Sequence, residues 1–430
     1  MSDPLRIGIA GLGTVGVGTV KLLRQNKELL AERCGREIVV TAVSARDISI
    51  DRGVSLSDFT WHGDAVALAT NENVDVVVEL IGGSDGIARD LVEAALDNGK
   101  HVVTANKALV AHHGVALAMA AENGGLIMAY EAAVAGGIPI IKALREGLSA
   151  NTIDHLYGIL NGTCNYILTS MRETGKEFQV VLAEAQELGY AEVDPAFDVE
   201  GVDAAHKLSI LASLAFGCRV NFDAVHVEGI RDVSPMDIEF AAELGYRIKL
   251  LGITCRTTNG IEQRVHPCMV PLDSPIAYVE DVFNAVVVHG DQVETTLYEG
   301  RGAGEGPTSS AVVADIADIA CGRNSRTFGI PAGKLAKLQT VAMSERNGCY
   351  YARFTVIDKP GVFAEIAAAL RDHDVSMEAV LQRGRAPGEP VSVVLTTHET
   401  READMMATIN TIDKTEAVVE PTRMIRIERF

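Results

Sequence analysis

The chain has 430 residues, of which 47% are hydrophobic and 22% charged, and its formal net charge is −20. This composition is typical of a globular protein with a large core, and the length predicts about two to four domains. The negative charge argues against binding to nucleic acid and against docking on anionic lipid, so we expect neither partner.

We expect no export signal and no membrane span. No apolar run reaches the roughly 18 residues that a membrane helix needs, and the N-terminus lacks a cationic start followed by an apolar core. The seven cysteines are scattered, without a C-x-x-C pair or the spacing of zinc ligands. These features predict a cytoplasmic protein with reduced thiols.

The first 130 residues alternate between short buried strands and helices. This order predicts an α/β domain built on a Rossmann-type, doubly wound parallel sheet. The predicted strands cover residues 5–10, 38–43, 74–80, 101–104 and 126–130, and the predicted helices cover 15–31, 86–98 and 109–122.

Residues 131–304 have the pattern of a mixed α+β domain with an open sheet. The predicted helices cover 137–148, 177–188, 203–216 and 235–245, and the predicted strands cover 246–255, 261–270, 285–290 and 292–299. A helix over 308–322 follows, and we expect the segment 305–345 to pack back on the first domain.

The tail has the element order βαββαβ, a ferredoxin-like arrangement. Its predicted strands cover 350–357, 375–382, 390–398 and 416–427, with helices at 363–373 and 400–410 and a linker at 332–347 before them. We therefore divide the chain into domains at 1–130, 131–304 and 349–430.

A glycine-rich turn follows the first predicted strand. The sequence GLGTVG at 11–16 has the G-x-G-x-x-G spacing between a strand and a helix, the context in which it indicates a dinucleotide site. Gly11 would allow a tight turn, Gly13 a close approach of the pyrophosphate, and Gly16 a close contact between helix and sheet. The residues between them in this candidate site are Leu12, Thr14 and Val15. The alternative is a purely structural turn.

The end of the second predicted strand bears on the choice of cofactor. An acidic residue there would bind the ribose 2′-hydroxyl of NAD, whereas an arginine would accept the 2′-phosphate of NADP. Arg46 favours NADP, and Asp47 directly after it keeps NAD possible.

A charged segment opens an apolar helix in the second domain. Asp203 and Lys207 are four residues apart, so a helix that starts near 202 would place both on one face. That face would offer a carboxylate and an ammonium group to a small zwitterionic ligand. The alternative is a solvated helix start, because acidic residues are favoured in a first turn. The acidic residues that precede this pair are Glu192, Asp194, Asp198 and Glu200.

Two loops at the end of the first domain carry further candidate groups. Lys107 follows a predicted strand, where α/β proteins bind ligands, and would meet the cofactor or the reacting oxygen; the alternative is a solvated lysine. Glu131 opens a Gly-rich loop that runs to Pro139. One carboxylate with accessible loop carbonyls suits a hard cation, and the alternative is a hinge.

Together, these motifs closely resemble those of bacterial homoserine dehydrogenases that carry a C-terminal ACT domain, and the resemblance covers essentially the whole chain. The matching segments are residues 11–16, 104–107, 130–131 with the loop after them, 161–163, 189–207 and 302–304. The resemblance implies the NAD(P)-dependent interconversion of L-homoserine and L-aspartate 4-semialdehyde. Two rival functions are an amino-acid dehydrogenase that acts at an amine and a non-catalytic amino-acid sensor.

The resemblance also implies that the domain at 131–304 binds substrate and forms a dimer interface, and it implies roles for individual residues. Lys207 would be the general acid/base, with Lys107 beside it. The residues that would bind substrate are Glu192, Asp198, Asp203, Gly162 and Thr163. Those that would bind the cofactor, besides the glycine turn and Arg46, are Thr104, Lys107, Gly189, Gly302 and Gly304. A sodium ion would be held by Glu131 and the carbonyls of Val134, Gly136 and Ile138. Asp194 and Glu200 would be solvated or capping residues.

The tail would be an ACT domain that regulates the enzyme. Its turn at 358–362, with the sequence DKPGV, looks like an ACT ligand-binding turn, and threonine is the expected inhibitor. The chain is expected to form a homodimer or a homotetramer.

Overall fold

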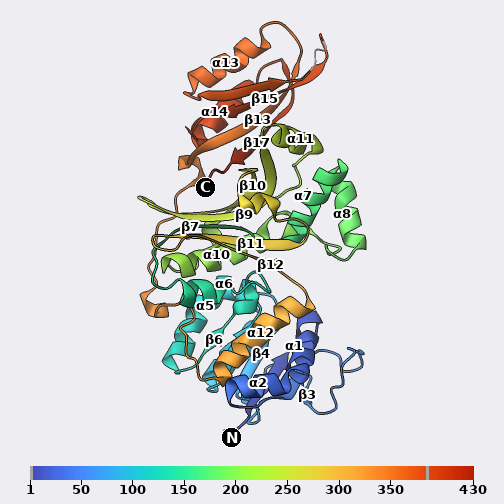
Figure 1. The fold of residues 1–430 in the computed structure, drawn as a ribbon, viewed down its shortest axis with the longest axis vertical. Coiled ribbons are helices and arrows are strands. Elements are labelled where there is room, and N and C mark those ends of the chain that lie inside the picture. The colour runs from blue at the N-terminus through green and yellow to red at the C-terminus, as the bar shows by residue number, and fades with distance from the viewer. Residues whose placement is uncertain (1–2, 384–386) are drawn as a thin grey trace.

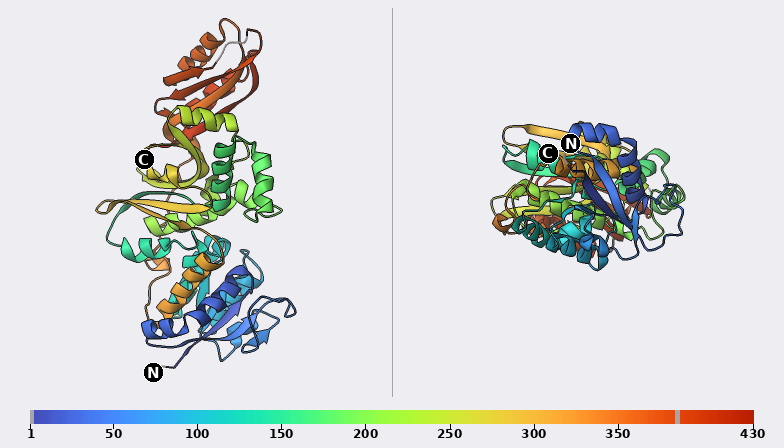
Figure 2. Two further views of the ribbon diagram at one scale, coloured as in Figure 1. Left: turned by 45° about the vertical axis from the view of Figure 1, so that its right-hand side comes forward. Right: turned by 90° about the horizontal axis from the view of Figure 1, so that it is seen from below.

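The structure is a computed structural model that describes residues 3–383 and 387–430. Three parts are stacked along one axis, with the N-terminal sheet at one end and the C-terminal unit at the other (Figure 1). The C-terminus lies beside the middle part rather than at an end of the stack (Figure 2). There the ring of Phe430 stacks on Tyr157, with ring centroids 3.4 Å apart.

The N-terminal part contains a six-stranded parallel sheet with the order β3-β2-β1-β4-β5-β6. Its strands are β1 (Leu5–Ala10), β2 (Ile38–Ser44), β3 (Thr60–His62), β4 (Val76–Glu79), β5 (His101–Thr104) and β6 (Met128–Ala129). Its helices are α1 (Thr14–Gln25), α2 (Lys27–Cys34), α3 (Ala67–Thr70), α4 (Ile87–Asp97) and α5 (Lys107–Asn123). Buried side chains that alternate along the strands pack against α4 and α5 on one face and against α1 on the other. The predicted doubly wound sheet is therefore confirmed.

Two details of this part differ from the sequence prediction. The helix predicted over 15–31 is two helices, because Asn26 leaves the helical conformation with φ −107° and ψ 22°. The sequence also does not predict β3 or α3. Helix α12 (Glu305–Ala320), from much later in the chain, packs closely on α1 at Gly18, where an added Cβ would lie 2.6 Å from the Glu305 side chain.

The middle part contributes antiparallel strands to a second, mixed sheet. In sheet order these are β12 (Glu294–Arg301), β11 (Phe283–Gly290), β7 (Ile153–Ile159), β9 (Tyr246–Thr257) and β10 (Gly260–Pro271), and the short β8 (His226–Val227) pairs with β10. The helices of this part are α6 (Ile140–Lys142), α7 (Gly162–Thr174), α8 (Phe178–Glu187), α9 (Ala196–Val199), α10 (Val202–Phe216) and α11 (Pro235–Glu243).

The structure differs most from the sequence prediction between residues 137 and 174. The helix predicted over 137–148 is the short α6 followed by a π-helical turn at Ala143–Gly147. Strand β7 and helix α7 are not predicted. Residues 162–174 include many β-branched and polar side chains with weak helix propensity, and the helix is instead stabilised by burial of Ile167, Leu168 and Met171.

The C-terminal unit has the predicted βαββαβ order. It comprises β13 (Asn347–Ile357), α13 (Val362–Asp372), β14 (Met377–Gln382), β15 (Pro390–Thr397), α14 (Glu402–Ile412) and β17 (Val418–Ile427), with the short β16 (Thr400–Arg401) against β13. Its strands continue the middle sheet, because β17 pairs in parallel with β10 at Cys268 and Met269. The sequence does not predict this continuous sheet.

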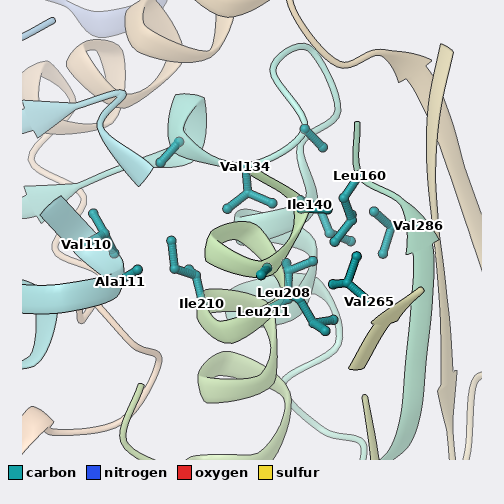
Figure 3. Packing of buried hydrophobic residues seen from close by; sticks show 14 of the residues in the cluster. Val110, Ala111, Val134, Ile140, Leu160, Leu208, Ile210, Leu211, Val265 and Val286 are labelled. Carbon is teal, nitrogen blue, oxygen red and sulfur yellow. The ribbon is translucent and has the colours of Figure 1, made fainter. Parts of the chain in front are cut away.

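Helix α10 lies at the centre of the molecule, between the two sheets. Its buried residues Leu208, Ile210 and Leu211 pack among side chains from both neighbouring parts (Figure 3). Because α10 is packed on nearly all sides, its N-terminal turn is held in one position. Within residues 3–383 and 387–430, no helix is long and apolar enough to span a membrane.

Candidate active site

A carboxylate and two ammonium groups meet at the N-terminal end of α10. Lys207 Nζ donates to Asp203 Oδ2 over 2.7 Å and to the carbonyl oxygen of Leu160 over 2.7 Å. Lys107, the first residue of α5, places its Nζ 2.7 Å from the other carboxylate oxygen, Asp203 Oδ1. Since α5 belongs to the N-terminal part and α10 to the middle part, this cluster joins the two.

Asn161 completes the cluster, and sequence reasoning did not give it a role of its own. Its Nδ2 donates to Asp198 over 2.7 Å and to Asp203 over 2.8 Å. Its Oδ1 accepts from the backbone N–H of Cys164 over 2.8 Å, which caps α7. An asparagine between a strand and a helix is a typical N-cap signal, but that signal was lost because neither β7 nor α7 is predicted.

The cluster keeps its charges through burial and pairing. Burial alone would raise the pKa of Asp203, but the ammonium groups of Lys207 and Lys107 lower it below its usual range. Burial lowers the pKa of Lys107, but the carboxylates of Asp203, Asp198 and Glu192 together raise it by more, so this pKa ends above the ordinary lysine value. Burial and the Asp203 charge both raise the pKa of Asp198. At neutral pH, therefore, Asp203 is an anion and Lys107 is a cation.

A cavity of about 270 Å³ opens beside both lysines. Its wall includes Val15 of α1, the loops after β4 and β5, residues 132–136, and the turn of Gly302 and Ala303 before α12. One cavity thus connects the glycine turn of the parallel sheet to the lysine pair on α5 and α10. It lies beyond the carboxyl ends of β4 and β5, where α/β sheets bind ligands.

The glycine turn has the geometry that its sequence predicts. Gly11 has φ +95°, and a Cβ there would lie 2.4 Å from the carbonyl oxygen of Leu80. A Cβ at Gly16 would lie 2.0 Å from the carbonyl oxygen of Gly11, whereas the space beside Gly13 is open. The first turn of α1 therefore has an uncovered backbone next to its N-terminus, which suits a pyrophosphate.

Comparisons with known proteins agree with this geometry. Family models described as "Homoserine dehydrogenase, NAD binding domain", "Homoserine dehydrogenase" and "ACT domain" match residues 11–131, 139–317 and 350–416. The homoserine dehydrogenase of Pseudomonas aeruginosa is 47% identical, and that of Neisseria gonorrhoeae is 48% identical, each over 99% of both chains. The crystal structure of a homoserine dehydrogenase from Thiobacillus denitrificans is 46% identical and superposes with a TM-score of 0.94, covering 99% of this chain and 98% of that one.

The chain belongs to the homoserine dehydrogenase family. It is an oxidoreductase with a nucleotide-binding domain and a C-terminal ACT domain, as the sequence motifs predict. Some of the remaining candidate residues line the cavity, and others lie outside its lining.

Three residues of the Thr104–Lys107 segment, Ala105, Asn106 and Lys107, line the cavity. Thr104 is fully buried and donates to Glu79 over 2.5 Å. Asn106 caps α5 by accepting from the N–H of Leu109, and it donates to the carbonyl of Gly83 over 2.7 Å. Asn106 and Lys107 line the cavity, whereas Thr104 lies behind them.

The loop after β2 places two arginines near the nucleotide turn. Arg46 is exposed, and Asp47 accepts two hydrogen bonds from Ser49 in a local turn. Arg52, which sequence reasoning missed, donates to the carbonyl oxygens of Asp47 and Leu12 over 2.6 and 3.3 Å. A basic residue is therefore in contact with the glycine turn itself.

The segment that carries Glu192 lies at the edge of the site. Glu192 is exposed and makes no ion pair within the described part of the chain, but its charge is close enough to raise the pKa of Lys107 slightly. Gly189 is also exposed, with φ +76°. Asp194 accepts from the N–H of Ala196, the first residue of α9, and Glu200 pairs with Arg231.

The other predicted glycines and Thr163 lie at helix starts. Gly162 is the first residue of α7, and the Thr163 hydroxyl donates to the carbonyl of Tyr190 over 2.8 Å. Gly304, with φ +121°, directly precedes α12, and Gly302 lines the cavity.

Glu131 lies in a buried acidic pair under the loop at 132–138. Its carboxylate accepts from the N–H groups of Ile141 and Lys142 over 2.9 Å each, and its own N–H donates to Asp315 over 2.8 Å. Burial and the Asp315 charge raise the pKa of Glu131 to about 7. Lys142 is the neighbouring ammonium group, 3.4 Å from Asp315.

Proposed function

We propose that the enzyme interconverts L-homoserine and L-aspartate 4-semialdehyde, with NADP as the preferred cofactor and NAD as a possible one. The observation that carries this proposal is the lysine pair on Asp203, because both lysines line a cavity that Val15 of the glycine turn also lines. The arrangement places a proton donor next to the position where a nicotinamide ring would meet a carbonyl or hydroxyl group.

Lys207 has one N–H left for the substrate. An ammonium group has three hydrogens, and two of them are donated to Asp203 and Leu160. The third is available to the reacting oxygen in the cavity. In the direction of reduction, Lys207 would give a proton to the developing alkoxide; in the direction of oxidation, the neutral amine would accept it.

The acidic residues would hold the other end of the substrate. We infer that Glu192 and Asp203 bind the ammonium group of homoserine, with Asp198 beside them, while Gly162 and Thr163 form the wall at the start of α7. Asp203 has a second task, because it also holds both lysines in position. Lys107 would orient the substrate or the cofactor from the opposite side.

The nucleotide would lie along the glycine turn. Bound NAD(P) supplies the hydride acceptor or donor for the reaction. The open backbone at Gly13 and the start of α1 would hold the pyrophosphate, and Gly189, Gly302 and Gly304 would border the nicotinamide end. Arg46 supports a preference for NADP, and Arg52 adds a second cation beside the turn.

A spectrophotometric assay tests the function. We expect absorbance at 340 nm to rise when the protein is mixed with L-homoserine and NADP, and to rise more slowly with NAD at equal concentration. An amine dehydrogenase would instead release ammonia from an amino acid, and a sensor would reduce neither cofactor. Absence of reduction with both cofactors would rule out the proposed reaction.

We also propose a sodium site formed by Glu131 and the carbonyls of Val134, Gly136 and Ile138. The donor set fits a hard cation, because it consists of oxygens and because the buried Glu131–Asp315 pair is short of positive charge. The ion would hold the loop that walls the cavity.

Glu131→Gln is expected to remove the dependence of activity on sodium. The amide keeps the shape of the side chain but not its charge. The KM for L-homoserine should therefore rise about tenfold, and added NaCl should no longer lower this KM. Activity measured against NaCl, with KCl at constant ionic strength, checks this. A variant that responds to sodium as the wild type does would exclude the site.

We further propose that threonine inhibits the enzyme at the ACT turn of residues 358–362, and that the chain forms a homodimer or homotetramer. The turn depends on Gly361, which has φ +100° and precedes α13. The mixed sheet ends at β12 and β14, and an end strand is able to pair with a second copy.

Gly361→Val is expected to weaken threonine inhibition at least about tenfold and to leave kcat nearly unchanged. A β-branched residue is strained at positive φ, so the turn would change shape, whereas the catalytic cavity shares no residue with it. Threonine titrations of the wild type, of Gly361→Val and of the control Gly99→Val, an exposed position in the N-terminal part that also has positive φ, would show the difference. Equal inhibition in all three would contradict the ACT proposal.

A further inference from the structure

Two histidines meet where α5 of the N-terminal part contacts α10 of the middle part. The Nε2 atoms of His112 and His206 are 3.2 Å apart, which is a hydrogen-bond distance. His112 lies five residues after Lys107 on α5, and His206 directly precedes Lys207 on α10. His112 is exposed, whereas His206 is only 4% exposed. The pair therefore joins the two helices that carry the two lysines of the site.

The surroundings of His206 set the direction of the bond between the two rings. Its Nδ1 lies 2.9 Å from the carbonyl oxygen of Val202, and a carbonyl only accepts, so Nδ1 carries the hydrogen. Burial lowers the pKa of His206, which keeps the ring neutral at neutral pH. Its Nε2 then has a free lone pair, and the Nε2–H of His112 donates to it.

The His206 ring is held in place by aromatic neighbours. It stacks on Phe222, from the turn after α10, with ring centroids 4.1 Å apart and an interplanar angle of 18°. The ring of Phe197, on α9, lies 5.6 Å from it and also 5.4 Å from the Nζ of Lys107. Because the acceptor has a fixed position, the hydrogen bond from His112 determines where α5 lies along α10.

Polar contacts attach α5 to the start of α10 at two points. Lys107 pairs with Asp203, and His112 bonds to His206, three residues further along α10. A helix held at one point is able to turn about it, whereas two points set its direction. Apolar side chains of both helices share one core (Figure 3), but such contacts are not directional.

We propose that His112 and His206 are positioning residues that keep Lys107 in place while substrate binds. This inference rests on the proposed function, in which the ammonium group of homoserine binds Asp203. A second cation at Asp203 would compete with Lys107 for the carboxylate, because two positive charges that share one carboxylate repel each other. The histidine bond does not involve Asp203, so it would hold α5, and with it Lys107, throughout binding.

Steady-state kinetics of three variants of the full chain test the proposal. His112→Leu removes the donor and should raise the KM for L-homoserine about three- to tenfold, the effect of losing one neutral hydrogen bond. Its kcat should change by less than about twofold, because the proton donor Lys207 is held by contacts that do not involve α5. His112→Gln keeps an N–H group of similar reach and should restore the wild-type KM. The control is His113→Leu, which removes the neighbouring histidine of α5 and its pairing with Asp85.

The comparison of KM with kcat separates positioning from a loss of folded protein. Unfolded chains lower the apparent kcat and leave KM unchanged, whereas loss of a binding interaction raises KM. A wild-type KM in His112→Leu would overturn the proposal. An equal rise of KM in His112→Gln or in His113→Leu would also overturn it, because the effect would then not depend on the hydrogen bond.

Amide hydrogen exchange of the intact protein is a second measurement, and it needs no turnover. Exchange in peptides from residues 107–112 should be faster in His112→Leu than in the wild type, and normal in His112→Gln. Unchanged exchange in His112→Leu would overturn the proposal as well. A wild type that does not oxidise homoserine would count against the proposed function alone, and the exchange rates would still show whether the histidine bond holds α5.

Discussion

Replacing Lys207 by alanine is expected to lower kcat by about two to four orders of magnitude, the usual contribution of a positioned proton donor. The affinity for NADP should stay within about threefold, because the glycine turn lies at the other end of the cavity. The fold should tolerate the change, since Asp203 keeps its ion pair with Lys107 and its hydrogen bond from Asn161. Steady-state rates at 340 nm and titration of NADPH fluorescence measure the two quantities.

Two further variants separate proton transfer from charge. Lys207→Arg keeps the positive charge but has a group that does not lose its proton in proteins, so it should be nearly as slow as alanine in homoserine oxidation. Lys176→Ala, which removes an exposed lysine paired with Glu184, is the control and should behave as the wild type. Turnover by Lys207→Ala near the wild-type rate would show that another group moves the proton.

The sequence alone predicts the features of the site that lie within one segment. The spacing of Gly11, Gly13 and Gly16 predicts a tight turn, and the structure has it: Gly11 has φ +95°, and Gly16 packs on the carbonyl oxygen of Gly11. Asp203 and Lys207 are four residues apart on a helix, and their side chains do meet. Both patterns depend only on the periodicity of a helix or a turn, which a sequence contains directly.

The contacts between segments were beyond sequence reasoning. Lys107 and Asp203 are 96 positions apart in the sequence. They pair only because α5 packs on α10. The role of Asn161 requires β7 and α7, whose weak propensities hide them. Before the structure, only the resemblance to a known family placed Lys107 and Lys207 in the same site. The resemblance did not identify Arg52, which contacts the glycine turn.

The largest difference concerns the tail. Its βαββαβ order is predictable, but its strands join the middle sheet through β17 and β10. Buried ion pairs cross this junction, among them Arg353 with Asp237 and Arg264 with Glu428. Deleting the tail would remove these partners and would expose apolar residues of the middle part that pack in one core with Tyr351 and Ile425, which is destabilising. A point change in the ACT turn therefore tests regulation better than a truncation does.

Asp203→Asn is expected to lower kcat/KM by about two orders of magnitude, the effect of displacing reacting groups by a small distance. The amide cannot balance two ammonium groups, so Lys107 and Lys207 should move apart. The pH profile of kcat/KM distinguishes this loss of lysine pairing from a general disturbance of the fold. Asp203 raises the pKa of Lys107 in the wild type, so this pKa should fall in the variant, and the basic limb of the profile should move to lower pH.

Stability gives an independent measurement on the same pair of proteins. The pKa of Asp203 is lower in the folded protein than the usual value of about 3.9 in an unfolded chain. Its ionised form therefore stabilises the fold at all pH values above about 4, and this contribution is lost as the pH falls through the folded pKa. Urea unfolding should show a constant difference between wild type and Asp203→Asn from about pH 6 to pH 8, and a smaller difference below about pH 4. Asp194→Asn, at an exposed position just before α9, should show neither this pattern nor the kinetic loss. A normal kcat/KM in Asp203→Asn would mean that the lysines do not need this carboxylate, and the proposed geometry of proton transfer would be wrong.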